Sequence, residues 1–191
     1  MKKLIIIFLI FLVGQNMSYA QDYIQELKNG ALLVRIPSTN QHKLKYLIAK
    51  GDTMKMLEEI EETQKYYENI VEAFNTEWSF CPVYFFWSDK TSEIKKGNLN
   101  NVYDFRGFLH PLTKQQKEQI KNNYLIAYIG ETQGNLKFNS LILSNPELIQ
   151  LKKPYPRYVR TYSGLSFLQR ELNKTVRILN KKIEWHYSRI Q

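Results

Sequence analysis

The stretch Phe80–Trp87 constrains the fold of this chain most strongly, because every residue in it except Pro82 is apolar or aromatic. It shows no alternation of polar and apolar residues, so neither side is suited to water. Short apolar runs rich in aromatic and β-branched residues are typical of strands covered on both faces. Pro82 stands near the start, where a missing N–H disturbs a sheet least. The run therefore predicts a central strand over residues 83–87.

Helical and strand patterns lie on both sides of this run. Residues 31–36, apolar except for Arg35, and the apolar run 124–129 end at Pro37 and Gly130, which predicts two further strands. Residues 53–78 place apolar side chains at alternating three- and four-residue steps, the pattern of a helix. This stripe consists of Leu57, Ile60, Tyr67, Val71, Phe74 and Trp78, with Gln64 as its polar member. It favours a helix packed on the sheet through these side chains, and a coiled-coil seam is the alternative.

The second half of the chain predicts a hairpin and a closing helix. Residues 138–143 and 148–151 are expected to pair around a turn at 144–147, followed by a loop over 152–160 and a helix over 163–183. Strands interleaved with helices predict an α/β fold. We expect a single-domain sandwich with a mixed, partly parallel sheet flanked by helices.

The first twenty residues have the three parts of a signal peptide. A basic start at Lys2 and Lys3 precedes an unbroken apolar run over 4–13, and small residues at Ser18 and Ala20 suit cleavage before Gln21. An uncut membrane anchor is the alternative, but the run is shorter than the about 20 residues that a spanning helix needs. We therefore expect residues 21–191 to form one exported domain, periplasmic or extracellular, with no transmembrane segment in the mature chain.

The charge of the chain is unevenly distributed. The formal net charge is +9, and loss of Lys2 and Lys3 with the leader lowers it to +7. Residues 50–78 carry three lysines against eight acidic residues, whereas residues 79–191 carry eighteen basic against eight acidic residues. A basic surface can meet an anionic envelope component or an acidic protein, and a merely bipolar surface is the alternative. Nucleic acid is not an expected partner of an exported protein.

Recognisable catalytic motifs are missing from the sequence. It contains no glycine-rich phosphate loop, no His-Glu-x-x-His, no Gly-x-Ser-x-Gly and no Cys-x-x-Cys. His42, His110 and His186 lack the spacing of metal ligands. Cys81 is the sole cysteine, so an intramolecular disulfide is excluded, and its apolar surroundings favour an inert buried thiol. The sequence assigns no catalytic residue, metal or cofactor, and whether the protein is an enzyme stays open.

The first candidate ligand site follows the predicted strand 83–87. In open α/β sheets, ligands bind beyond the carboxyl ends of the strands, where this polar segment would lie. Its hydroxyls and carboxylate could bind a polar ligand or a cation, and a solvated turn is the alternative. The candidate residues are Ser88, Asp89, Lys90 and Thr91.

The second candidate is the basic, aromatic and proline-rich segment 152–162. Basic residues interleaved with tyrosines can stack on planar groups and pair with carboxylate or phosphate. A connector packed on the sheet edge is the alternative. The candidate residues are Tyr155, Arg157, Tyr158 and Arg160.

These observations favour a non-catalytic exported binding protein that uses the basic aromatic loop. The alternative is an envelope enzyme with a site at the carboxyl end of strand 83–87. An enzyme would need titratable groups such as Asp89, Asp104 and His110 to converge in a pocket.

Residues 138–179 resemble the second half of a thioredoxin-like domain. The resemblance rests on Phe138-Asn-Ser-Leu-Ile-Leu-Ser-Asn-Pro-Glu-Leu-Ile-Gln-Leu151, then Tyr162-Ser-Gly164 and the following helix. The redox cysteine pair and the cis-proline of that family have no counterparts, so the resemblance implies a fold without redox activity. The leader, Phe-Cys-Pro-Val-Tyr-Phe-Phe and Pro-Tyr-Pro-Arg-Tyr-Val-Arg also resemble a group of short exported bacterial proteins with no assigned function.

The exported protein should begin at Gln21, because the tripartite leader and its small residues direct cleavage there. N-terminal sequencing of protein recovered outside the cytoplasm measures this. A product that still begins Met1-Lys2-Lys3 would contradict the prediction.

Overall fold

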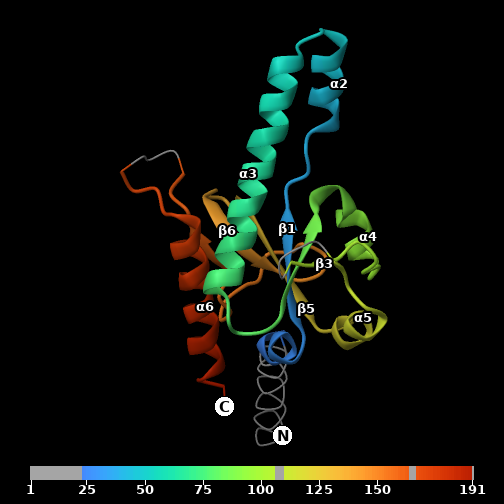
Figure 1. Ribbon diagram of the computed structural model, residues 1–191. Coiled ribbons are helices and arrows are strands. Elements are labelled where there is room, and N and C mark those ends of the chain that lie inside the picture. The colour runs from blue at the N-terminus through green and yellow to red at the C-terminus, as the bar shows by residue number, and fades with distance from the viewer. Residues whose placement is uncertain (1–22, 106–109, 164–166, 191) are drawn as a thin grey trace, which may run out of the picture.

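The structure, a computed structural model, describes residues 23–105, 110–163 and 167–190, and the predicted leader lies outside them. After a helical segment over 23–29, the elements follow an α/β order (Figure 1). They are β1 (Ala31–Ile36), α2 (Gln41–Ala49), α3 (Thr53–Glu77), β2 (Val83–Trp87), the 3-10 helix Ser88–Lys90, α4 (Thr91–Lys95), β3 (Tyr103–Asp104), β4 (His110–Pro111), α5 (Lys114–Ile120), β5 (Tyr124–Glu131), β6 (Asn139–Ser144), β7 (Tyr158–Arg160) and α6 (Leu172–Tyr187).

All the strands belong to one sheet, in the order β4-β3-β2-β1-β5-β6-β7. β1 runs parallel to β2 on one side and to β5 on the other, whereas β3, β4, β6 and β7 join as antiparallel neighbours. This confirms an α/β fold with a mixed, partly parallel sheet flanked by helices. The strand predicted as central, Val83–Trp87, lies inside the sheet, but β1 occupies the middle position.

Both faces of the parallel strands are covered, which explains why their sequences lack polar alternation. Leu32, Val34 and Phe85 face α3 and α6, whose buried side chains form one core cluster with them. Leu33 and Phe86 face the opposite side, where they pack with residues of α4, α5 and the loops around them. Figure 1 shows the two helical layers on opposite sides of the sheet.

The long helix α3 packs on the sheet through only its second half. Tyr67, Val71 and Phe74 are buried as predicted, but Leu57 and Ile60 are 53% and 41% exposed, so their predicted packing on the sheet is wrong. A helix of 25 residues is about 37 Å long, roughly twice the length of the strands beneath it. The first half therefore extends past the sheet and runs alongside α2 (Figure 1).

The predicted hairpin of residues 138–143 with 148–151 forms only at its turn end. An antiparallel bridge joins Gln150 to Ser144, and Leu151 N donates to Leu143 O at 3.0 Å. The rest of β6 pairs with β5 and β7 instead. β7 is the last strand of the antiparallel series β5-β6-β7, and it lies within the segment predicted as a loop over 152–160. Val159 is buried between half-buried Tyr158 and Arg160, a strand alternation that the neighbouring prolines obscured in the sequence.

The closing helix also begins later than predicted. α6 starts at Leu172 rather than at 163, because Glu171 adopts an extended backbone with ψ of 149°. Leu172, Val176 and Leu179 lie on its covered side as expected, whereas Leu168 precedes the helix and is 50% exposed. Residue 165 lies outside the described residues. Across the described ranges, no helix is both long and apolar enough to cross a membrane.

Replacement of Phe85 by alanine should destabilise the protein by about 3–5 kcal/mol, the usual cost of truncating a buried aromatic side chain. Phe85 is 1% exposed and packs edge-on against Phe74 and Phe105. Denaturant unfolding measures the change, and Leu57→Ala on the exposed half of α3 is the control, with an expected loss below about 1 kcal/mol. A loss below about 1 kcal/mol for Phe85→Ala would contradict the buried-strand assignment.

Candidate functional site

The carboxyl ends of β1, β2 and β5 meet at one edge of the sheet, as parallel strands require. The chain leaves β1 toward the face covered by α3 and leaves β2 toward the face covered by α4. The strand order reverses at β1, because the chain passes from β1 to β2 on one side and later reaches β5 on the other. Open α/β sheets bind ligands beyond the carboxyl ends of the strands at such a point. The predicted site residues 88–91 directly follow β2 at this edge.

The polar side chains at this edge are engaged with one another. Ser88 Oγ accepts a hydrogen bond from Ser38 N at 2.9 Å and contacts Ser38 Oγ at 2.9 Å. Arg35 Nε donates to Thr91 Oγ1 at 3.0 Å, and Thr91 Oγ1 donates to Ser88 O at 2.6 Å. These bonds join the segment that follows β1 to the segment that follows β2, so they stabilise the fold at this edge.

The charged residues of the same segment form surface ion pairs. Lys90 Nζ lies 3.5 Å from Asp89 Oδ2 and 3.8 Å from Glu93 Oε1. Both Asp89 and Lys90 are substantially exposed, and exposed pairs at such distances contribute little to stability. The side chains of residues 88–91 therefore bond to one another and to neighbouring residues, as expected for a solvated turn.

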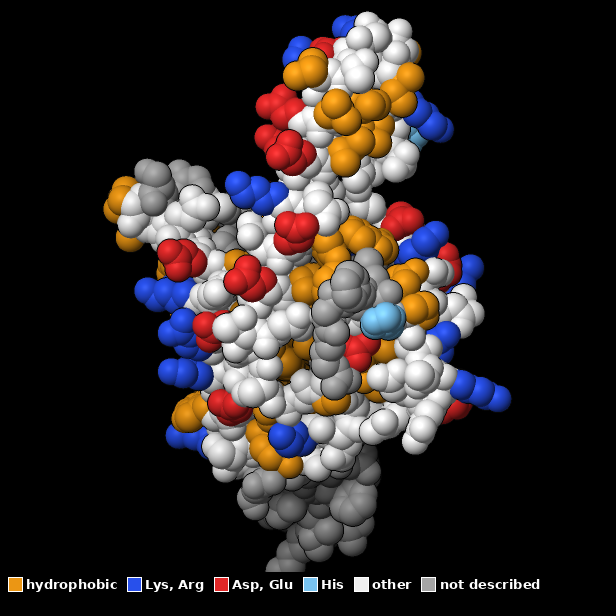
Figure 2. Space-filling model, in the orientation of Figure 1, with side chains coloured by type: hydrophobic (Ala, Val, Ile, Leu, Met, Phe, Trp, Pro, Cys, Tyr) orange, Lys and Arg blue, Asp and Glu red, His pale blue; other side chains and the backbone are white. Residues whose placement is uncertain are grey.

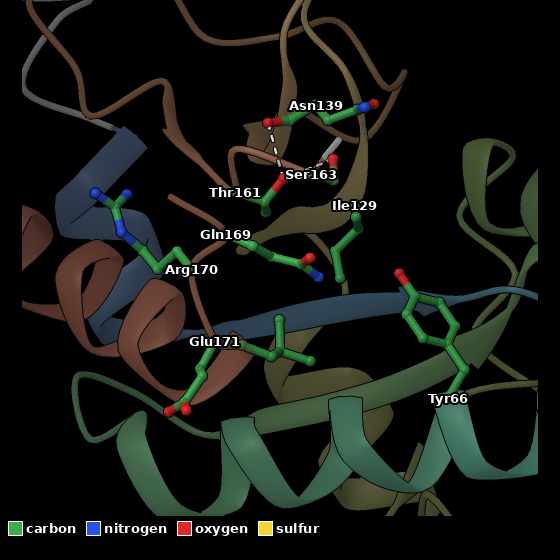
Figure 3. A pocket seen from close by; sticks show the side chains of 9 residues that line it. Tyr66, Ile129, Asn139, Thr161, Ser163, Gln169, Arg170 and Glu171 are labelled. Carbon is green, nitrogen blue, oxygen red and sulfur yellow. Dashed lines mark hydrogen bonds between the residues drawn. The ribbon is translucent and has the colours of Figure 1, made fainter. Parts of the chain in front are cut away.

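A pocket of about 540 Å³ opens farther along this edge, between α3, the end of β5 and the start of α6 (Figure 3). Figure 3 shows the Tyr66 hydroxyl and the Gln169 amide pointing into the space near Ile129, with Arg170 and Glu171 pointing away. Burial raises the pKa of the Tyr66 hydroxyl above its ordinary value. The remaining lining residues are Asn139, Thr161, Ser163 and Leu172.

The basic aromatic segment forms a separate cleft of about 380 Å³ against α6, called the basic cleft below. Lys153, Arg157 and Lys182 supply its charged lining, and no carboxylate joins them from the described residues. The other lining residues are Pro154, Tyr155, Pro156 and Tyr158. The structure therefore brings together three of the four predicted site residues of this segment.

The walls of the basic cleft are held by the sheet and by α6. Arg157 O accepts a backbone hydrogen bond from Leu143 N at 2.9 Å, which fixes the segment to β6. The Tyr155 ring packs against the rings of Tyr23 and His186, with centroids 5.6 and 5.5 Å away. Lys182 Nζ donates to Tyr158 O at 3.3 Å. These contacts fix the backbone at Arg157, the Tyr155 ring and the Lys182 amine.

The positive charges in and near the basic cleft repel one another. The pKa of Lys182 is lowered chiefly by burial, and the positive charges of Arg170 and Arg157 lower it further. Within the described residues, neither Arg157 nor Lys182 forms an ion pair with a carboxylate. An anion placed there would relieve this repulsion.

Arg160, the fourth predicted residue of the segment, lies outside the cleft lining. Its guanidinium stacks on the Phe138 ring, 3.6 Å from the centroid, and its carbonyl accepts a hydrogen bond from Arg170 Nη1 at 2.6 Å. Arg160 therefore packs on the sheet edge, as the connector interpretation of this segment anticipated.

A further pocket of about 520 Å³ near the start of β2 bears on the enzyme hypothesis. Asp104 and Cys81 are among its lining residues, but Asp89 and His110 are not. The three titratable groups that the hypothesis needed together are thus not gathered in this pocket. Among the described residues, no group of three or more His, Cys, Asp or Glu side chains could hold a metal ion.

Several site residues escaped sequence reasoning because they come from distant elements. Lys182 enters the basic cleft from α6, and Tyr66 enters the larger pocket from α3. Each belongs to a helical pattern in which it looks like an ordinary surface position. Only the charge excess of residues 79–191 hinted at a gathering of cations.

Comparisons of the chain with protein-family models, with curated proteins and with solved structures found no match. The resemblance of residues 138–179 to thioredoxin-like domains therefore stays a prediction. The site must be interpreted from its own chemistry.

The Cys81 thiol should react slowly in the folded protein, because burial raises its pKa to about 12 and leaves little thiolate. Alkylation by iodoacetamide at pH 8, followed by mass spectrometry, measures the rate. Unfolded protein in denaturant is the control and should react at the rate of an ordinary cysteine. Equal rates in the two states would show that Cys81 is an accessible, reactive thiol.

Proposed function

We propose that this protein is an exported, non-catalytic binding protein that holds an anionic group of an envelope component in the basic cleft. One observation carries the proposal: Lys153, Arg157 and Lys182 line a single cleft together, and no carboxylate among the described residues lines it. Arginine and lysine at one site are suited to phosphate or carboxylate groups.

Preorganisation supports this function. The Arg157 guanidinium carbon lies 5.3 Å from the centroid of the Tyr158 ring, and Tyr155 is wedged between two other rings. Side chains and prolines that are already ordered lose less conformational entropy when a ligand binds. The exposed tyrosine surface adds contacts to the apolar part of a ligand, which salt leaves largely unchanged.

An enzyme site at the carboxyl end of β2 has less support. The hydroxyls of Ser88 and Thr91 are bonded to neighbouring residues, and the pocket that Asp104 lines contains neither Asp89 nor His110. The pocket of Figure 3 offers neutral hydrogen-bonding groups instead. We therefore place the function in binding.

Replacement of Arg157 by alanine should weaken binding of an anionic probe by about tenfold or more, the loss expected for a hydrogen bond to a charged group. Phosphatidylglycerol vesicles and soluble glycerol 1-phosphate are the probes, measured by co-sedimentation and calorimetry, with phosphatidylcholine vesicles as the neutral control. Binding should also weaken with added salt, since screening acts within about 8 Å at physiological ionic strength.

Arg160→Ala is the matched control, because it removes the same charge from a residue that does not line the cleft. Binding of glycerol 1-phosphate would identify the anionic group as sufficient, and binding of vesicles alone would identify a lipid surface. No binding to either probe, or equal losses in the Arg157 and Arg160 variants, would overturn the assignment to the basic cleft. The effect should also shrink as the pH rises through the lowered pKa of Lys182, because the neutral amine no longer attracts an anion.

A further inference from the structure

The helix α2 and the first half of α3 form an antiparallel hairpin outside the body of the protein, called the arm below (Figure 1). The Asn40 side chain caps α2 and the Asp52 side chain caps α3. Gly51 takes the positive φ of 70° that the turn between them requires. Lys43 and Glu59 form an ion pair between the two helices. The arm is thus a defined helical element.

One side of the arm exposes apolar side chains. The exposed fractions are 62% for Ile48, 78% for Met54, 53% for Leu57 and 41% for Ile60. Met54, Leu57 and Ile60 follow one another at three-residue steps and therefore share a face of α3. Figure 2 shows apolar side chains gathered on the arm, on the face turned to the viewer. These four residues are called the arm face below.

Tyr46 belongs to the other side of the arm. It is two positions from Ile48, which turns it about 200° away around α2. Lys50 Nζ lies 4.6 Å from its ring centroid, so this aromatic surface already has a cation over it. The arm face is therefore confined to one side.

The two margins of the arm face carry opposite charge. Glu58 and Glu61 lie four residues after Met54 and Leu57, so they border the face along α3. Lys45 is exposed on α2, a helix that contains no acidic residue. Figure 2 shows acidic side chains along the α3 margin of the arm and a basic one along the α2 margin.

We propose that the arm face packs against the arm face of a second copy of this chain, about a two-fold axis parallel to the arm. This axis sets each α2 against α3 of the other copy, so that each basic margin meets an acidic margin. An axis across the arm would instead bring acidic margin to acidic margin. The charge pattern therefore selects both the occupant and its orientation.

The size of the arm face fits this partner. The exposed parts of its four side chains amount to on the order of 400 Å², the size of a substantial apolar patch on a monomer. A standard interface buries about 800 Å² on each partner, of which somewhat more than half is apolar. The margin glutamates also disfavour an anionic lipid surface as the occupant.

Under this proposal the two halves of the apolar stripe on α3 pack against different partners. Its second half, from Tyr67 onward, packs within the chain, and its first half, with Leu57 and Ile60, packs between chains. A coiled-coil seam was the alternative that the stripe left open.

Sedimentation equilibrium of the purified protein from low to high micromolar concentration tests the proposal. Wild-type protein should dimerise, and Leu57→Glu should weaken dimerisation about tenfold or more by placing a charge in the contact. Leu136→Glu, the same change at a body residue that is 75% exposed, is the control and should dimerise like wild type. Because both positions are exposed in the single chain, both variants should keep the wild-type circular dichroism and, at concentrations where the wild type is monomeric, its melting temperature.

A charge exchange tests the orientation. Lys45→Glu alone and Glu61→Lys alone should each weaken dimerisation several-fold, because each sets like charges together at both margins. An equimolar mixture of the two variants should recover the wild-type association, since every margin then pairs opposite charges. A wild-type protein that stays monomeric, including one that binds vesicles instead, overturns the proposal. Leu57→Glu protein that dimerises like wild type, or single charge variants unaffected by the change, also overturns it.

Discussion

β1 is flanked by parallel strands on both sides, and the rest of the structure depends on this pairing. Its backbone is bonded to β2 and to β5, and Ala31, Leu32, Leu33 and Val34 are at most 1% exposed. Parallel neighbours need long crossovers, so helices must cover both faces of the sheet. The entry to β1 is equally tight, because a side chain at Gly30 would collide with the backbone of Asn123 at the start of β5.

The crossover from β1 to β2 gives the molecule its shape. It uses α2 and the 25-residue α3, which is far longer than a strand of five or six residues needs. The surplus length has no sheet to cover and stands out as the arm. The first half of α3 has a charged side and an apolar side. The charged side meets solvent, and we propose that the apolar side meets a second copy of the chain.

The basic cleft lies beside β7, at one edge of the sheet. β7 pairs with β6 at the edge, and the chain before β7 runs along α6. This placement brings Arg157 and Lys182 into one cleft. Burial is the chief cause of the lowered pKa of Lys182, and the charges of Arg170 and Arg157 lower it further. Cations that are held together without a carboxylate are costly in a folded protein unless an anion compensates them, and our proposal of the cleft as a ligand site rests on this cost.

The sequence by itself determined the elements whose signal is local. The buried strands over 31–36, 83–87 and 124–129 followed from their short apolar runs, broken only by Arg35, and α3 followed from its helical stripe. The α/β class followed from their alternation. The placement of residues 88–91 at the carboxyl end of β2 was also foreseen, because a segment that follows a parallel strand has nowhere else to go.

Only the tertiary structure decided which elements meet. Residues 158–160 pair with most of β6, and residues 148–151 bridge only its end. The sequence did not reveal the strand at 158–160, because the neighbouring prolines obscure its alternation. Leu57 and Tyr67 follow the same helical pattern, yet one is exposed and the other buried, since the sheet ends between them. Lys182 joined Arg157 from another element. Periodicity reports which face of a helix is apolar, but the position of the neighbouring elements determines what that face contacts.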